Sequence, residues 1–191
     1  MRFYSFIITA VVVATHSNGS AEEPGKTESM LDSLELKLEL SRHEHLLVQK
    51  KDPQNVLSEF TTDGCSGGLS VGWQYLSRKI DHLITIHGDL PPWESCCITH
   101  DRRYHTTGDG DITAEMSFQL RREVDEQLRA CVLDTGVSRA TELSGEYDLS
   151  EEEVGRVYKV IGDLMYRAVR IGGVPCSGLP WRWGYGWPTC N

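Results

Sequence analysis

The chain has 191 residues, of which 39% are hydrophobic and 25% are charged, and its formal net charge is −9 at pH 7. A chain of this length can form one domain with a hydrophobic core and an appended segment. Because the net charge is negative and no long basic run occurs, the composition argues against nucleic acid as a partner.

The first 21 residues have the pattern of a secretory signal peptide. Arg2 supplies a positive charge, a mainly apolar stretch runs from Phe3 to Ala14, and small residues follow, among them Gly19 and Ala21. The apolar stretch is shorter than the roughly 20 residues of a membrane-spanning helix. We therefore expect residues 1–21 to be removed and the protein to be secreted and soluble, with an uncleaved anchor as the alternative.

Residues 22–51 form the next segment. Residues 22–29 are polar, and we expect them to be disordered or loosely attached. The remainder is rich in Leu, Glu and Lys, which favours a helix, although part of it alternates as a strand would. The Lys50–Lys51 pair is interpreted as the solvated end of this helix, with a processing site that releases a pro-region as the alternative.

Residues 52–191 are expected to form one mainly α-helical domain. Asp52 and Pro53 predict the start of a short helix, and Ser150 with Glu153 predicts a capping box at the start of a long one. A glycine-rich loop is expected at 61–68, further helices at 71–85, 94–106, 112–134 and 151–171, and a coil rich in Gly, Pro and Trp at 175–191. No repeat and no strand-rich region is evident.

The six cysteines all follow the signal segment. An even number of cysteines in an oxidising compartment predicts three disulfides, and the count alone allows 15 pairings. A zinc site formed by Cys96, Cys97 and His100 is the alternative, but the usual ligand spacings of zinc sites are absent.

The helix expected at 94–106 determines the directions in which Cys96, Cys97 and His100 point. Cys96, His100 and Tyr104 are four residues apart and share one face, while Cys97 lies on a neighbouring face. The two cysteines therefore point toward different elements. We expect each of them to pair with another part of the chain and not with its neighbour.

A bond from Cys96 to Cys131 on a following antiparallel helix would bring Asp125 to His100. At about 1.5 Å per residue, His100 lies roughly 6 Å along from the bridge, Asp125 roughly 9 Å and Tyr104 roughly 12 Å. The Asp125 carboxylate would then accept a hydrogen bond from one imidazole nitrogen of His100 and leave the other as a base. Tyr104 would donate to the same carboxylate.

Cys97 would then point to another loop, and Cys65 in the glycine-rich loop is the natural partner. That bridge would place backbone carbonyls beside Asp101, and carbonyls with a carboxylate suit calcium. The expected calcium ligands are the Asp101 carboxylate and the backbone carbonyls of Gly64, Ser66 and Gly68. A general base beside a calcium ion is an arrangement for hydrolysis.

Three motifs resemble the secreted calcium-dependent phospholipase A2 family. "CCITHDRRY" is similar to the family's active-site helix, C-C-x-x-H-D-x-x-Y, "DGCSGG" resembles its calcium loop, and "DEQLRAC" resembles its aspartate-bearing helix. The resemblance covers residues 61–132. It implies a mainly α, disulfide-stapled phospholipase A2-like fold, in which two long antiparallel helices carry the active site. It also implies three disulfides, Cys65–Cys97, Cys96–Cys131 and, as the remaining pair, Cys176–Cys190.

The resemblance further implies hydrolysis of the sn-2 ester of glycerophospholipids, which releases a fatty acid and a lysophospholipid. It assigns the base to His100, its partner carboxylate to Asp125, the supporting hydroxyl to Tyr104 and the calcium carboxylate to Asp101. The expected partner is a phospholipid aggregate or membrane surface, with no obligate protein partner. The alternatives are a non-catalytic lipid- or receptor-binding relative, or a protein whose terminal segments mediate assembly.

The chain departs from the family pattern in several places. Ser66 stands where the family's calcium loop usually has glycine, and the interval between Tyr104 and Asp125 leaves no room for the family's β-hairpin wing. The extra C-terminal helix and the Trp-rich tail lie outside the resemblance.

The remaining polar and aromatic clusters are expected to have structural and not catalytic roles. We expect His43 and His45 to be solvated, and the Asp109 and Asp111 region to be a turn and not a second calcium site. The tail residues Trp181, Trp183, Tyr185 and Trp187 are interpreted as an aromatic plug, with a membrane-interface role as the alternative. A local basic surface patch is considered for Arg102, Arg103, Arg121 and Arg122.

Overall fold

The computed structural model describes residues 24–66, 73, 85, 87–88, 90–108 and 110–190. These residues form α1 (Pro24–Lys51), the 3-10 helix η1 (Gly64–Ser66), α4 (Glu94–Thr106), α5 (Ala114–Ser138), α6 (Ala140–Tyr147) and α7 (Glu151–Gly172). No strand occurs within this part of the chain, so the mainly α expectation is confirmed for it. The signal segment 1–21, Gly68 and most of the helix expected at 71–85 lie outside the described residues.

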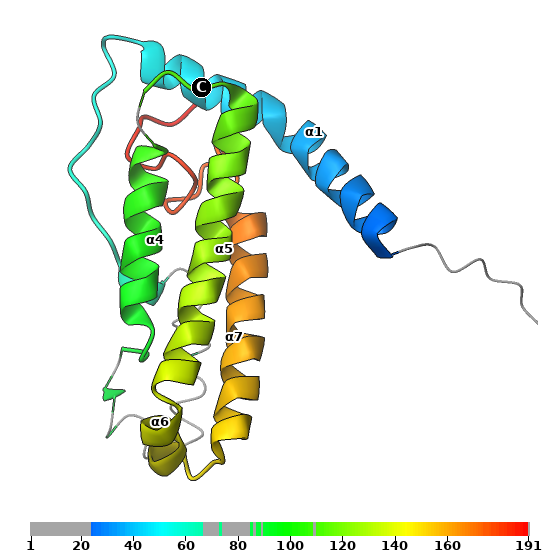
Figure 1. Cartoon of the computed structure of the whole chain (residues 1–191). Helices are drawn as coiled ribbons and strands as arrows, with labels where there is room; N and C mark the ends of the chain where they lie inside the picture. Colours follow the sequence, from blue (N-terminus) through cyan, green and yellow to red (C-terminus); the bar gives the residue numbers. More distant parts are fainter. Residues whose placement is uncertain are drawn as a thin grey trace, which may run out of the picture.

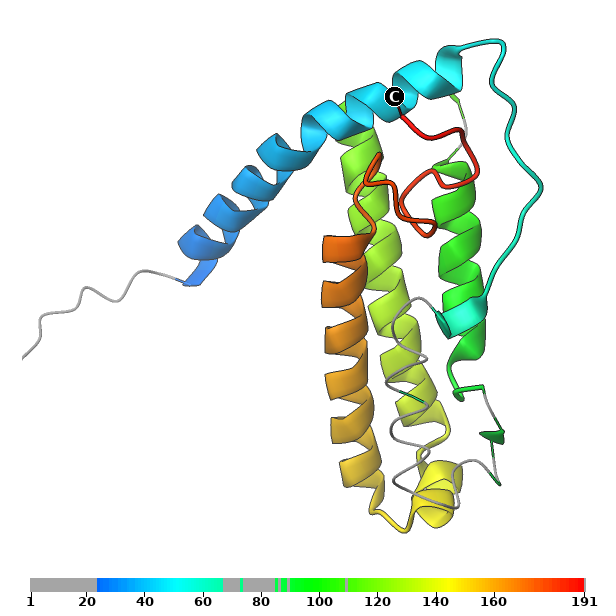
Figure 2. The same ribbon diagram turned by 180° about the vertical axis from the view of Figure 1, so that it is seen from behind.

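Helices α4, α5 and α7 lie side by side, with α5 in the middle and antiparallel to both neighbours (Figures 1 and 2). Helix α1 crosses one end of these three helices at an angle, and the chain after α7 folds back beneath it (Figure 2). Across the described ranges, none of the helices combines the length and apolar character that a bilayer span requires.

Local signals account for the ends of the long helices. The Thr113 hydroxyl caps α5 by accepting a hydrogen bond from the backbone N–H of Met116 at 3.2 Å. Ser150 and Glu153 form the predicted capping box at the start of α7. The helix predicted at 94–106 has the observed bounds of α4, and the one predicted at 151–171 ends one residue later, at Gly172.

Two expectations for the N-terminal half are wrong. Helix α1 already begins at Pro24, so most of the segment 22–29, expected to be disordered or loosely attached, is helical and not disordered. No helix begins at Asp52; its carboxylate instead accepts a hydrogen bond from the backbone N–H of Gln54 at 2.9 Å and forms a turn. Aspartate is common both as a helix cap and in turns, so the residue type at position 52 does not distinguish a helix start from a turn.

The larger core cluster lies mainly between α5 and α7. Its buried side chains include Leu128, Val132, Val154, Tyr158 and Met165, and both cysteine pairs that involve α4 adjoin it. Helical spacing in the sequence predicts an apolar stripe on α7, formed by Val154, Val157, Ile161, Leu164 and Ala168. The prediction is wrong at two positions, because Val157 and Leu164 are exposed. Helix α7 is rotated so that the residues one position later, Tyr158 and Met165, face the core.

The smaller core cluster joins α1, α4, α5 and the tail. Leu46, Tyr104, Val124 and Trp183 are its buried members, and Trp183 is only 1% exposed. This residue fills the role of an aromatic plug. Trp181, in contrast, is 40% exposed.

The expectation for His43 is wrong, since its side chain is fully buried on α1, whereas the neighbouring His45 is exposed. Arg121, considered above as part of a surface patch, is also fully buried. Both side chains lie in a polar network between α1 and α5, in which Glu39 contacts His43 and Arg121.

Candidate active site

Two disulfides fix α4 between other elements. Cys96 is bonded to Cys131 on α5, and Cys97 is bonded to Cys65 in η1, with Cα–Cα distances of 5.8 and 5.2 Å. The third disulfide, Cys176–Cys190, lies in the C-terminal tail. These are the three pairs that the resemblance implies, and they leave no free thiol for a zinc site.

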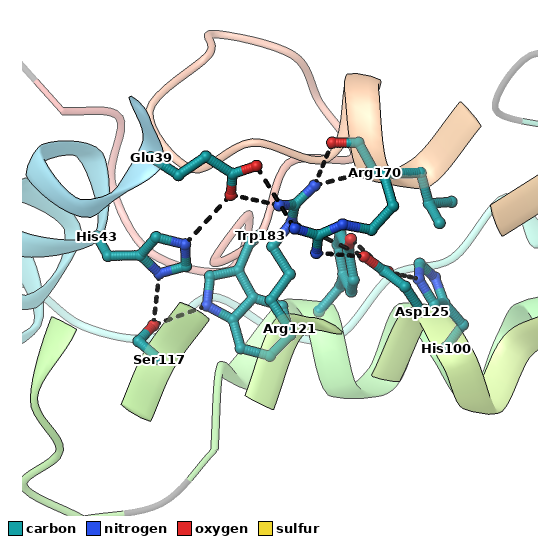
Figure 3. Close-up of polar contacts among 10 residues, drawn as sticks. Glu39, His43, His100, Ser117, Arg121, Asp125, Arg170 and Trp183 are labelled. Atoms are coloured by element: carbon teal, nitrogen blue, oxygen red, sulfur yellow. Dashed lines mark hydrogen bonds and ion pairs between the residues drawn. The ribbon is translucent and has the colours of Figure 1, made fainter. Parts of the chain in front are cut away.

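The bridge to α5 brings His100 and Tyr104 to Asp125. The His100 Nε2 atom lies 2.9 Å from Asp125 Oδ1, and the Tyr104 hydroxyl donates to the same oxygen at 2.6 Å. Figure 3 shows His100 and Asp125 turned toward one another between the helices. Because Asp125 is fully buried, its carboxylate depends on these protein donors. The carboxylate selects the tautomer in which Nε2 carries the proton, so Nδ1 is left as the acceptor.

The surroundings of His100 set its protonation behaviour. Burial opposes the charged imidazolium, but the hydrogen bonds and negative charges of Asp101 and Asp125 outweigh burial and raise the pKa of His100 above its ordinary value. The pKa of Tyr104 is raised well above its ordinary value by burial and by the nearby Asp125 charge. Tyr104 therefore remains a hydrogen-bond donor at neutral pH.

The second oxygen of Asp125 faces two arginines. The Arg170 Nη1 atom donates to Asp125 Oδ2 at 2.9 Å, and the Arg121 Nε atom lies 4.0 Å from the same oxygen. Both guanidinium groups are buried. Sequence reasoning missed both residues at the site, because Arg170 lies outside the matched motifs and Arg121 was interpreted as a surface residue.

His100 opens onto a cavity between α4, α7 and the tail. The polar part of its lining comes from Asp63, Gly64 and Asp101, beside His100 and Tyr104. The apolar part comes from Leu128, Met165, Val169 and Trp181. A neighbouring cavity shares Asp63, Asp101 and Trp181 with it and extends toward Tyr185. The cavity is therefore polar at one side and apolar at the other.

Asp101 lies at the polar side, where calcium was expected. Its Oδ1 is 3.6 Å from the Nδ1 atom of His100, and its Oδ2 accepts a hydrogen bond from the Thr62 hydroxyl at 2.6 Å. Gly64 adopts φ +64°, and a Cβ at this position would lie 1.6 Å from a carboxylate oxygen of Glu94. The backbone of η1 is therefore held directly against the first turn of α4.

The donor chemistry of this corner fits a hard cation. Burial raises the pKa of Glu94, and the charges of Asp101 and Asp63 raise it further, although the N–H of Cys65 acts in the opposite direction. A divalent cation would relieve this accumulation of negative charge. Within the described ranges no three His, Cys, Asp or Glu side chains are grouped as metal ligands. A calcium ion would therefore need backbone carbonyls, such as those of Gly64 and Ser66, in addition to Asp101.

The Trp-rich tail holds the chain that leads into this corner. The Tyr185 hydroxyl donates to the carbonyl of Thr61 at 2.7 Å, and the backbone N–H of Ser58 donates to the carbonyl of Gly186 at 2.9 Å. The Phe60 ring contacts His105 on α4. The tail thus fixes the position of Thr62 and, through it, one oxygen of Asp101.

Comparison of the chain with protein-family models, with curated proteins and with solved structures found no match. The described part of the site contains a histidine oriented by a buried carboxylate, an acidic corner and an apolar wall.

Proposed function

We propose that the protein is a calcium-dependent phospholipase A2, which hydrolyses the sn-2 ester of glycerophospholipids and releases a fatty acid and a lysophospholipid. The observation that carries this proposal is the oriented pair of His100 and Asp125 at a cavity that has both an acidic side and an apolar side. The motif resemblance supports the same reaction.

His100 acts as the general base. Its Nδ1 atom accepts a proton from a water molecule as the water oxygen attacks the ester carbonyl carbon, and the resulting imidazolium returns this proton to the glycerol oxygen when the sn-2 ester C–O bond breaks. The Asp125 carboxylate holds the imidazole ring in the required tautomer and stabilises the positive charge that the ring gains. Tyr104 donates to Asp125 and so fixes the carboxylate that orients the base.

The acidic corner serves the carbonyl side of the reaction. Calcium held by Asp101 and by backbone carbonyls, for which Gly64, Ser66 and Gly68 remain the expected donors, would supply positive charge beside the ester carbonyl oxygen. Thr62 keeps Asp101 oriented by donating to its Oδ2 atom.

The apolar wall serves the acyl chain. Leu128 from α5, Met165 and Val169 from α7, and Trp181 from the tail would contact the methylene groups of the substrate. Each buried methylene contributes roughly 0.8 kcal/mol of favourable transfer free energy, so such a wall selects a lipid. The exposed edge of Trp181 lies at this wall, where the substrate would enter from a phospholipid aggregate or membrane surface.

We further propose that the protein acts outside the cell, after removal of residues 1–21. Three disulfides agree with an oxidising compartment. No obligate protein partner is required by this proposal.

The test is fatty-acid release from mixed phospholipid–detergent micelles by the oxidised protein, with calcium or with a chelator. We expect release to require calcium and to fall by about 100-fold or more in His100→Gln, the scale of general-base catalysis. His45→Gln is the matched control, because His45 is exposed on α1 away from the cavity. Lack of calcium-dependent release by the folded wild-type protein would refute hydrolysis, and vesicle co-sedimentation would then test the lipid-binding alternative.

A further inference from the structure

A chain of buried charges joins the N-terminal helix α1 to Asp125. Glu39 on α1 accepts a hydrogen bond from Arg121 Nη1, and its Oε1 atom lies 3.5 Å from Arg170 Nη2. Arg170 in turn donates to Asp125 through Nη1. Figure 3 shows Glu39, the two guanidinium groups and Asp125 in sequence, with His100 at the far end.

The charges in this chain balance. Two arginines face two carboxylates, and all four side chains are less than 10% exposed. Burial lowers the pKa of the adjacent His43, despite the opposing effect of Glu39, so this imidazole stays neutral at pH 7. Removing one member would leave a buried charge without its partner, which costs far more than losing an exposed ion pair.

The two carboxylate oxygens of Asp125 accept hydrogen bonds from different groups of residues. Oδ1 accepts from His100 and Tyr104, which form the site, whereas Oδ2 accepts from Arg170. Arg170 is not part of the cavity lining, and it contacts Asp125 at the oxygen that does not bind His100. Its effect on the reaction therefore passes through the orientation of the carboxylate.

Arg170 and Arg121 are themselves fixed from α1 and from the end of α7. Arg121 Nη2 donates to the carbonyls of Val169 at 3.0 Å and Arg170 at 2.5 Å, which closes the last turn of α7 around it. Glu39 supplies the negative charge on the opposite side. Among the described contacts, Glu39 thus faces both guanidinium groups from the side opposite Asp125.

A neighbouring arrangement of Ser117, His43 and Glu39 has the residue types of a nucleophilic triad, but it is not a second active site. Ser117 and His43 are fully buried, and the Ser117 oxygen already accepts a hydrogen bond from the Trp183 indole at 3.0 Å. The hydroxyl lies 2.9 Å from His43 Nδ1. These residues tie α1 to α5 and the tail, and they keep Glu39 in position.

We propose that Arg170 is a positioning residue for Asp125, and that Glu39 of α1 holds Arg170 in the orientation this requires. On this inference α1 is part of the functional unit and not a detachable pro-region. The inference rests on the proposed function for its effect on turnover, while its effect on the His100–Asp125 hydrogen bond is independent of turnover.

The kinetic test uses Arg170→Gln, Arg170→Lys and Glu39→Gln in the full chain. Hydrogen-bond partners that orient metal ligands contribute about 10- to 100-fold to activity, and we expect the partner of a carboxylate that orients a general base to contribute on the same scale. We expect kcat to fall by this factor in Arg170→Gln with KM within about twofold, partial recovery in Arg170→Lys, and a smaller fall in Glu39→Gln. The matched control is Arg156→Gln, because Arg156 lies on the exposed face of α7 and pairs only with Glu152 and Glu153 among the contacts described.

The structural test is the ring N–H proton resonance of His100, assigned by its absence in His100→Gln. A hydrogen bond to Asp125 moves this resonance downfield, and we expect it to move upfield or broaden in Arg170→Gln but not in Arg156→Gln. Should Arg170→Gln fail to fold, Arg170→Lys and Glu39→Gln carry the same comparison. If the wild-type protein shows the His100 resonance but no turnover, the proposed function fails. The change of this resonance in the variants still measures the positioning role of Arg170. Wild-type kcat together with an unchanged resonance in the folded Arg170 and Glu39 variants would overturn the inference.

Discussion

Asp125 accepts hydrogen bonds at both of its carboxylate oxygens inside a buried part of the molecule. A carboxylate in such a place is stable only when its surroundings provide donors and positive charge. Tyr104 and Arg170 provide both, from α4 and from α7. His100 therefore faces an acceptor whose position is determined by three different elements of the fold.

Tyr104→Phe tests the contribution of the phenolic donor. Loss of a hydrogen bond to a buried charge typically costs about 1.5–3 kcal/mol, so we expect the free energy of unfolding to fall by about this amount. Activity should fall less than in His100→Gln, because the His100–Asp125 bond remains. Equilibrium urea denaturation with an unchanged m-value would measure the loss. A variant as stable as the wild type would show that Tyr104 contributes packing alone.

The sequence predicted part of this site and not the rest, for a physical reason. His100 and Tyr104 share one helix face through their spacing, and a single bridge was enough to place Asp125 beside them. Glu39 and Arg170 lie 82 and 49 residues from Arg121, and charged side chains are normally exposed. Their burial depends on the packing of α1 and α7, which local patterns do not specify.

At the scale of elements, α5 and α7 approach closely where small residues allow it. A Cβ on Gly136 of α5 would lie 2.5 Å from the Cβ of Tyr158, and one on Gly162 of α7 would lie 2.4 Å from the side chain of Leu133. The absence of a side chain at Gly136 leaves room for the buried Tyr158 to pack directly against α5. The predicted stripe on α7 was wrong only at Val157 and Leu164, because Tyr158 and Met165, one position later, lie against the core, and helical periodicity alone does not specify so small a rotation.

Gly136→Ala tests whether this approach is required. Alanine favours an isolated helix over glycine, yet here its methyl group would overlap the Tyr158 ring, so we expect a loss of about 1–3 kcal/mol in the free energy of unfolding. Gly155→Ala on α7 is the control, because a Cβ there meets nothing within 4 Å. That variant should be more stable than the wild type by about 0.5–1 kcal/mol. Denaturant titrations of both variants would decide, and equal effects would argue against close packing at Gly136.

The ends of α4 and the start of α7 were predicted closely, whereas α5 ends at Ser138, four residues beyond the predicted position. The caps of α7 and the limits of α4 follow from residues adjacent in sequence, such as Ser150 and Glu153, so the pattern contains the information. Helix α6 was not predicted, and its first residue, Ala140, follows the end of α5 after only one residue. Nothing in the local pattern marks that break, and α6 has no side-chain cap at its start.

At the scale of the whole molecule, segments distant in sequence surround the α4–α5 pair. Helix α1 covers one end, the tail fills the space between α1 and α4, and η1 closes the other side through Cys65 (Figures 1 and 2). Trp183 of the tail contacts both Tyr104 and Ser117. The acidic corner at Asp101 is thus held from the tail and from η1, so a cation bound there would stabilise the folded state as a whole.

Calcium should therefore raise the thermal stability of the protein without any substrate present. A ligand at 100 times its Kd adds about 2.7 kcal/mol to the free energy of unfolding, and for a chain of this size that corresponds to an increase in Tm of roughly 5–10 °C. We expect the increase to be reversed by a chelator and to be absent in Asp101→Asn, because the corner loses the carboxylate that faces His100.

Asp111→Asn is the matched control, since Asp111 is exposed, pairs with Lys51 and lies outside the cavity. Thermal unfolding of the three proteins with calcium, magnesium or chelator would measure this. An increase that persists in Asp101→Asn but disappears in Asp111→Asn would move the calcium site from the active-site corner to the turn before α5.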